Sequence, residues 1–154
     1  MTSKLFDQIK QDLVLILKAN KPQEVLVLRG ILSSVHNKEI EKGKDAELID
    51  DDVLSVLMLE AKKRKDAIAL YEKGGRPEKA EDERRELEII SKYLPEQLSE
   101  EEITEIVKEV IKETGAETMQ DMGKVMGQIM AKVKGKADGM KVKEIVGREL
   151  MQKA

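Results

Sequence analysis

The residues best suited to chemistry in this sequence are lysines near its C-terminal end. They surround the expected turn between the last two helices and are Lys132, Lys134, Lys136, Lys141 and Lys143. Because Gly135 and Gly139 lie in the same turn, these lysines can follow an irregular phosphate backbone, and the N–H groups that start the next helix add donors. The pattern indicates a phosphate site or, alternatively, a turn whose lysines only keep the surface soluble.

Charge is unevenly distributed around this turn. Residues 96–121 hold nine acidic residues and two lysines, a net charge of −7. Residues 123–154 hold eight basic and three acidic residues, a net charge of +5, while the whole chain carries only −3. The acidic segment is expected to repel polyanions and the basic segment to attract them.

Two glycines, Gly123 and Gly127, interrupt the helix expected before the turn. Each costs about 1 kcal/mol relative to alanine in a helix, so a compensating contact is expected. Their spacing places both on one face, where the missing side chains allow another backbone to approach closely. That backbone belongs either to a neighbouring helix or to a nucleic acid.

The same region carries methionines at steps of three and four: Met119, Met122, Met126 and Met130. Such a stripe favours a place in the core, although a groove that adapts to several partners is the alternative. We interpret the stripe as core.

Arg64 stands apart from its basic neighbours, because it follows Leu57 by seven positions and precedes Ile68 by four. That spacing places it within the apolar stripe of its helix. A buried guanidinium needs a carboxylate partner, and we expect one from the region of Glu39 and Glu41. The alternative is an arginine that binds an anion through planar, bidentate geometry.

Little in the sequence indicates catalysis. The chain has no cysteine, which excludes thiolate metal sites, and its single histidine, His36, has no companion at metal-ligand spacing. His36 is therefore expected to be structural or at the surface. We find no nucleophile–base pair, nucleotide-binding glycine loop or paired-carboxylate signature, so we expect no metal, no cofactor and no catalytic residue.

Apolar residues recur at steps of three and four almost throughout, which predicts helices and no strand. Prolines and acidic clusters suit the helix starts, one start is a Ser-x-x-Glu capping box, and glycines suit the ends. The seven expected helices cover residues 5–17, 22–43, 50–74, 77–95 and 99–115, then a stretch from 118 and one over 138–151.

The best candidate for a joint is the short break at residues 93–98. We therefore expect an all-α protein with a four-helix subdomain at residues 1–95 and a three-helix subdomain at residues 96–154. No apolar run approaches the ~18–20 residues that span a bilayer, and the opening sequence MTSKLFDQIKQDL lacks a secretory signal. A soluble, cytoplasmic protein without a membrane partner is expected.

Two linear motifs in the second half of the chain resemble the GatB/YqeY family. They are KYLPEQLSEEEI at residues 92–103 and TGAETMQDMGKVMGQIMAKVKGKADGMKV at residues 114–142. Upstream, LRGILSSVHNKEIEKG, KKRKDAIALYEKGGR and the acidic stretch before Tyr93 also resemble free-standing YqeY-like proteins, so the similarity covers nearly the whole chain. The segment PEKA after Arg76 departs from the family pattern.

The resemblance implies an all-helical, two-part fold and a link to tRNA. In the B subunit of the glutamine-dependent aminoacyl-tRNA amidotransferase, the corresponding helical module is an appendage that engages tRNA away from the chemistry. The resemblance covers that module and not the kinase or amidotransferase domains. It therefore implies binding without catalysis.

We expect a tRNA-binding or tRNA-associated protein. RNA shape should be what it recognises, because only Phe6, Tyr71 and Tyr93 could stack on bases. The alternatives are an adaptor that docks on a protein partner and, by family analogy alone, a glutamine-dependent carbon–nitrogen ligase. The residues expected at the nucleic acid are Gly123, Lys124, Gly127, Lys132, Lys134, Gly135, Lys136 and Lys141.

Overall fold

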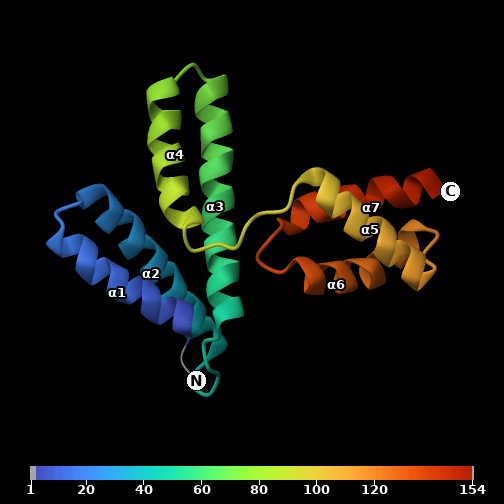
Figure 1. Ribbon diagram of the computed structural model, residues 1–154, viewed down its shortest axis with the longest axis horizontal. Helices are drawn as coiled ribbons and strands as arrows, with labels where there is room; N and C mark the ends of the chain where they lie inside the picture. The colour runs from blue at the N-terminus through green and yellow to red at the C-terminus, as the bar shows by residue number, and fades with distance from the viewer. Residues whose placement is uncertain (1–2, 154) are drawn as a thin grey trace. The chain divides into compact units, whose positions relative to one another are not determined.

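The computed structural model describes residues 3–153, which form seven α-helices and one 3-10 helix without a strand (Figure 1). The expected all-α class is therefore confirmed. No helix within that range is long and apolar enough to cross a membrane. The outer limits of the two expected subdomains, residues 1 and 154, lie outside the described residues.

These helices divide into two compact units between Pro95 and Glu96. Each unit has its own apolar core. The first unit holds α1 (Lys4–Lys18), α2 (Pro22–Lys42), α3 (Asp50–Lys73) and α4 (Pro77–Ser91). The second unit holds α5 (Glu100–Thr114), the 3-10 helix η1 (Met119–Asp121), α6 (Met122–Val133) and α7 (Gly139–Lys153).

The first unit buries the apolar stripes of its four helices against one another. α3 and α4 lie side by side as an antiparallel pair, and α1 and α2 form a second pair (Figure 1). Burying each large apolar side chain contributes about 1.5–3 kcal/mol, so all four helices depend on the shared core. The largest fully buried side chains are Ile9, Leu28, Ile31, Leu57 and Ile90.

One carboxylate joins the starts of two helices in this unit. Asp50, which begins α3 as expected, accepts a hydrogen bond from Ser3 Oγ at 2.5 Å and another from the Leu5 amide at 3.1 Å. These hydrogen bonds, above all that from Ser3, hold the pKa of Asp50 below its usual range. A negative charge is therefore maintained beside the positive N-terminal ends of both α1 and α3.

Arg64 has carboxylate partners, but not the expected ones. Its guanidinium lies 2.8 Å from Glu60 Oε2, one turn earlier in α3, and 3.1 Å from Glu86 Oε2 in α4. Glu39 and Glu41 pair with side chains of their own helix instead, so the prediction of those partners is wrong. The reason is that α4 packs beside α3 and brings its acidic residues to Arg64.

Two helix ends differ from the expected positions. α4 ends at Ser91, before Pro95, and the Tyr93 amide already bonds three residues back in a tighter turn. The Tyr93 hydroxyl donates to Asp12 Oδ2 in α1 at 2.6 Å, which holds this turn against the core. In the second unit, Thr118 caps η1 rather than α6, which begins directly after that short helix.

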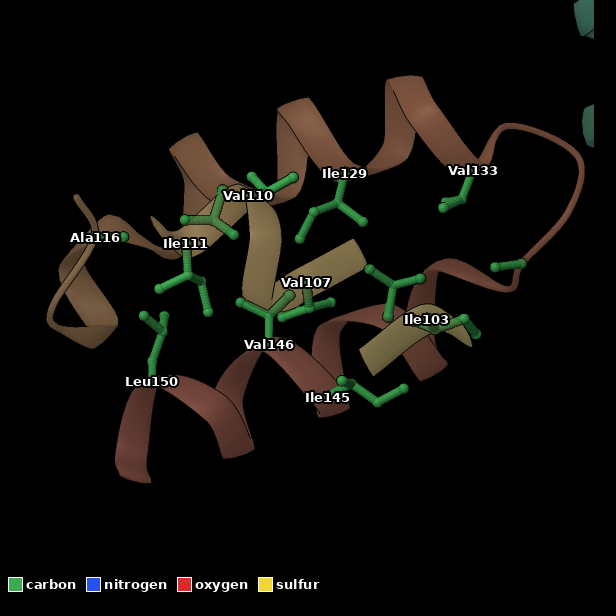
Figure 2. Close-up of a cluster of buried hydrophobic side chains, with 13 residues drawn as sticks. Ile103, Val107, Val110, Ile111, Ala116, Ile129, Val133, Ile145, Val146 and Leu150 are labelled. Atoms are coloured by element: carbon green, nitrogen blue, oxygen red, sulfur yellow. The ribbon is translucent and has the colours of Figure 1, made fainter. Parts of the chain in front are cut away.

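Three helices enclose the core of the second unit. α5 packs against both α6 and α7, and α6 packs against α7. In Figure 2, Val107 and Val110 of α5, Ile129 of α6 and Val146 of α7 point into the same interior. None of these four side chains is exposed to solvent, so the apolar faces of the three helices depend on one another.

The expected start and stop signals of α5 are confirmed. Ser99 Oγ accepts a hydrogen bond from the Glu102 amide at 3.1 Å, and Glu102 Oε2 accepts one from the Ser99 amide at 3.2 Å. Gly115 follows the helix with φ +68°, a conformation that favours glycine. These caps fix where the acidic helix begins and ends.

Candidate nucleic-acid interface

The turn that carries the lysines is a loop of residues 134–138 between α6 and α7. α6 ends at Val133, whose carbonyl accepts a hydrogen bond from the Lys136 amide at 2.8 Å. Gly135 has φ +73°, a left-handed conformation that L side chains rarely adopt, so glycine allows the chain to turn here. As expected, Asp138 caps α7, and its Oδ1 accepts from the Met140 amide at 3.3 Å.

Two residues that precede α5 form hydrogen bonds with the backbone of this loop. Gln97 Nε2 donates to the Gly135 carbonyl at 2.8 Å, and the Leu98 amide donates to the Lys136 carbonyl at 2.9 Å. Both carbonyls are thereby occupied, and the Lys134 and Lys136 side chains remain exposed. The sequence did not indicate this brace, because its partners are 38 residues apart.

Four of the five lysines of the predicted site gather at this loop. Lys132 lies in the last turn of α6, Lys134 and Lys136 lie in the loop, and Lys141 lies in the first turn of α7. Lys124 belongs to the first turn of α6, and at a rise of 1.5 Å per residue it starts about 12 Å from Lys132 along the helix axis. The structure therefore concentrates positive charge around the loop and leaves Lys124 apart from it.

We call Lys132, Lys134, Lys136 and Lys141 the loop lysines. Lys132 and Lys141 form ion pairs with α5. Lys132 Nζ lies 3.8 Å from Glu113 Oε2, and Lys141 Nζ lies 3.3 Å from Glu100 Oε2. All four side chains are about half exposed, and such surface ion pairs contribute little to stability. Both ammonium groups therefore stay accessible from solvent while they are paired.

Glu100 and Arg148 belong to this charged surface, although sequence reasoning missed them. Arg148 Nη1 lies 3.3 Å from Glu100 Oε1, and a hollow of about 290 Å³ opens beside the pair. Hydrogen bonds from Lys141 and from Arg148 hold the pKa of Glu100 below its usual range. The opposite charges of residues 96–121 and 123–154 were the signal that could have found this contact.

Gly123 and Gly127 do not receive a neighbouring helix. Both are exposed on α6, and a Cβ atom added to either would meet no heavy atom within 4 Å in the part of the chain that the structure describes. Of the two alternatives, a neighbouring helix of the second unit is therefore ruled out, because α6 turns Val125 and Ile129 toward the core of that unit and these glycines away from it. Close approach by a nucleic acid stays a prediction.

The methionine stripe lies against the core, with one exception. Met119 is 51% exposed. The Met122 and Met130 methyl groups each lie 3.7 Å from the position that a Cβ atom would take on a glycine of α7, Gly147 and Gly139 respectively. The core interpretation is confirmed for the three members that are partly buried, namely Met122, Met126 and Met130.

The other candidate residues lie in the first unit. His36 is exposed in α2, where its Nδ1 lies 3.4 Å from Glu39 Oε2. Within residues 3–153, no group of three or more His, Cys, Asp or Glu side chains is arranged to hold a metal ion.

The three aromatic residues all precede Pro95 in the sequence, so the loop lysines have no aromatic neighbour within their own unit on which a base could stack.

Comparison with known proteins gives a family match. The sequence model of a family described as Yqey-like protein matches residues 6–150. The chain is also similar to three curated proteins named "Altered inheritance of mitochondria protein 41, mitochondrial". Identity is 38% over 88 residues for Lachancea thermotolerans (56% of this chain, 46% of the relative) and 34% over 85 residues for Kluyveromyces lactis (55% and 45%). For Clavispora lusitaniae it is 33% over 90 residues (58% and 51%), so each match spans about half the length of the relative.

Proposed function

Because this chain belongs to the YqeY-like family, we propose that it is a helical module that binds tRNA and has no catalytic activity of its own. The observation that supports this function best is the α6–α7 loop, where four lysines surround a backbone held by Gln97 and Leu98. Phosphate contacts need cations at an accessible surface, and recognition of RNA shape needs no aromatic side chain.

Each part of the loop has a proposed role. Lys132, Lys134, Lys136 and Lys141 contact phosphates, and the N–H groups at the start of α7 add donors. Gly135 lets the chain turn so that the RNA backbone approaches the loop closely. Along the uncovered face of α6, Gly123 and Gly127 leave room for the RNA backbone, and Lys124 adds a further phosphate contact.

The first test measures binding to an unmodified tRNA transcript at increasing salt. About four phosphate contacts give a slope near −3 in log affinity against log salt, which is a loss of roughly 50- to 100-fold between 50 and 200 mM. Replacing Lys132, Lys134 and Lys136 by alanine should weaken binding by at least about tenfold at 50 mM and leave the far-ultraviolet circular dichroism unchanged. Fluorescence anisotropy of labelled tRNA gives both quantities.

A matched control removes the same number of positive charges from the first unit. Lys44, Lys65 and Lys73 are exposed there, and replacing all three by alanine should change affinity less than about threefold. Equal losses in the two triple variants would show that only net charge matters. Binding that does not respond to salt would contradict the proposal.

The adaptor alternative has its own outcome in a pull-down. The exposed acidic residues of α5 favour it as a docking surface for a protein. The tagged chain should then retain a protein partner after nuclease treatment, and the loop lysine variant should retain it equally. Enrichment of tRNA that is lost in the lysine variant supports the proposed function instead.

The remaining parts of the proposal concern chemistry and location. Ammonia release from glutamine by the purified chain would support a carbon–nitrogen ligase, although the chain contains no cysteine for a thiol glutaminase.

We also propose a cytoplasmic location, whereas the names of the curated relatives place those proteins in mitochondria. Imaging of the tagged protein in its own cells distinguishes the two locations.

A further inference from the structure

The acidic helix α5 reaches the basic loop region at two separate points. Glu100, in the first turn of α5, pairs with Lys141 at 3.3 Å. Glu113, near the other end of α5, pairs with Lys132 at 3.8 Å. Lys132 and Lys141, both proposed to contact phosphates, are thus already in contact with carboxylates of the same unit.

Resting on the function proposed above, we infer that Glu100 and Glu113 compete with RNA phosphates for the loop lysines and so set the affinity of the site. A phosphate and a carboxylate both present oxygen acceptors to an ammonium group. Lys132 and Lys141 must exchange one for the other when RNA binds. When no RNA is bound, carboxylates of the acidic segment, residues 96–121 with a net charge of −7, then occupy the place of RNA phosphates.

The exposure of these pairs makes such an exchange feasible. In a buried ion pair the lysine could not readily move to a phosphate, because the carboxylate left unpaired in the interior would be strongly unfavourable. Here the four side chains are 44–54% exposed, so the released carboxylates return to water. An exposed pair is worth about 1.4- to 5-fold in an equilibrium constant, which is enough to weaken RNA binding without abolishing it.

Exchange also changes the dependence of binding on salt. A lysine that is already neutralised by a carboxylate releases fewer counterions from the complex than a free lysine does. Breaking both pairs in advance should therefore make the slope of log affinity against log salt steeper by about 1, from the wild-type value near −3 toward the roughly −3.5 to −4.5 of five full phosphate contacts at 0.7–0.9 each. Removing a carboxylate that has no lysine partner should leave this slope unchanged.

The experiment compares two double variants of the full chain. Glu100→Gln with Glu113→Gln removes both paired carboxylates. Glu105→Gln with Glu109→Gln removes two exposed carboxylates of the same helix that form no ion pair with the loop lysines within the described residues. Both variants change the net charge equally, and far-ultraviolet circular dichroism checks that each remains helical.

Binding to a labelled tRNA transcript is measured from 50 to 200 mM salt. We expect the Glu100/Glu113 variant to bind about fivefold more tightly than the wild type at 50 mM, with the steeper slope. The Glu105/Glu109 variant should gain less than twofold, with the wild-type slope.

If the two variants gain tRNA affinity equally and show equal salt slopes, the inference that Glu100 and Glu113 compete with RNA is wrong. The carboxylates of α5 would then affect binding only through their total negative charge. Wild-type binding with the normal salt response would then still support the proposed function. If neither the wild type nor any variant binds tRNA at 50 mM, the proposed function fails, and this inference fails with it.

Discussion

The two units use charged side chains in different ways. In the first unit, Arg64 lies between helices and pairs with Glu60, which is only 8% exposed. In the second unit, Lys132 and Lys141 pair with α5 at the surface. The Arg64 guanidinium therefore joins α3 to α4 through Glu86, whereas the Lys132 and Lys141 pairs lie at the surface, as the proposed exchange with a ligand requires.

Replacing Arg64 by methionine should have the largest effect on stability. A small effect would contradict the comparison between the two units. The change removes the closest cation of the nearly buried Glu60, which keeps Lys63 Nζ at 3.3 Å, so we expect the free energy of unfolding of the first unit to fall by about 2–3 kcal/mol. Urea unfolding followed by tyrosine fluorescence measures this unit alone, because both tyrosines precede Pro95.

Arg85 provides the control for that variant. It pairs with Asp82 at 3.6 Å, and both side chains are more than half exposed. Replacing Arg85 by methionine should change the stability by less than about 0.5 kcal/mol. Equal losses at Arg64 and Arg85 would mean that burial does not separate the two kinds of ion pair.

Replacing Gly123 and Gly127 by alanine should raise stability and lower function in the second unit. An added methyl group meets no neighbour at either position, so each change should stabilise α6 by about 1 kcal/mol. If RNA approaches this face, tRNA affinity should fall at the same time by about tenfold. Thermal unfolding and fluorescence anisotropy measure the two effects.

Gly30 of α2 is the matched control for the glycine prediction. It is exposed inside a helix, and a Cβ atom added there also meets nothing within 4 Å. Replacing Gly30 by alanine should stabilise the first unit by a similar amount and leave tRNA affinity unchanged. A double variant at Gly123 and Gly127 that binds tRNA as tightly as the wild type would remove these glycines from the proposed interface.

Acid should weaken the first unit slightly through Asp50. Its pKa is lowered in the folded chain, so its contribution is present above the pKa of about 4 in the unfolded chain and is lost as the pH falls through the lower folded value. Because Asp50 is exposed, we expect about 0.5 kcal/mol after allowing for screening by solvent. Replacing Asp50 by asparagine should reduce the loss of stability between pH 5 and pH 3, as measured by tyrosine fluorescence in urea.

Much of the helical pattern could be predicted because its signals are local. Pro22, Ser99 and Gly115 act on residues within one turn of themselves, and each begins or ends a helix where the sequence indicated. The lysines of the loop are also local, since four of them fall within ten residues of one another.

The features that escaped prediction depend on contacts between distant residues. Arg64 finds Glu86 through the packing of α4 on α3, which its own helix does not encode. Gly123 and Gly127 face solvent because of the way α6 packs on α5 and α7. Their spacing of four residues places them on one face of the helix but does not say whether that face is toward the core or toward solvent. Pairing between α5 and the loop lysines likewise needs the three helices to be assembled.

The brace on the α6–α7 loop has a consequence for the order of events during folding. Gln97 and Leu98 meet Gly135 and Lys136 only after both α5 and α6 have closed the intervening segment, and closing a segment of that length costs entropy before any bond is gained. A nascent chain therefore contains Gln97 and Leu98 well before their partners Gly135 and Lys136 have been made. Newly made protein acquires this surface only when synthesis of the second unit is nearly complete.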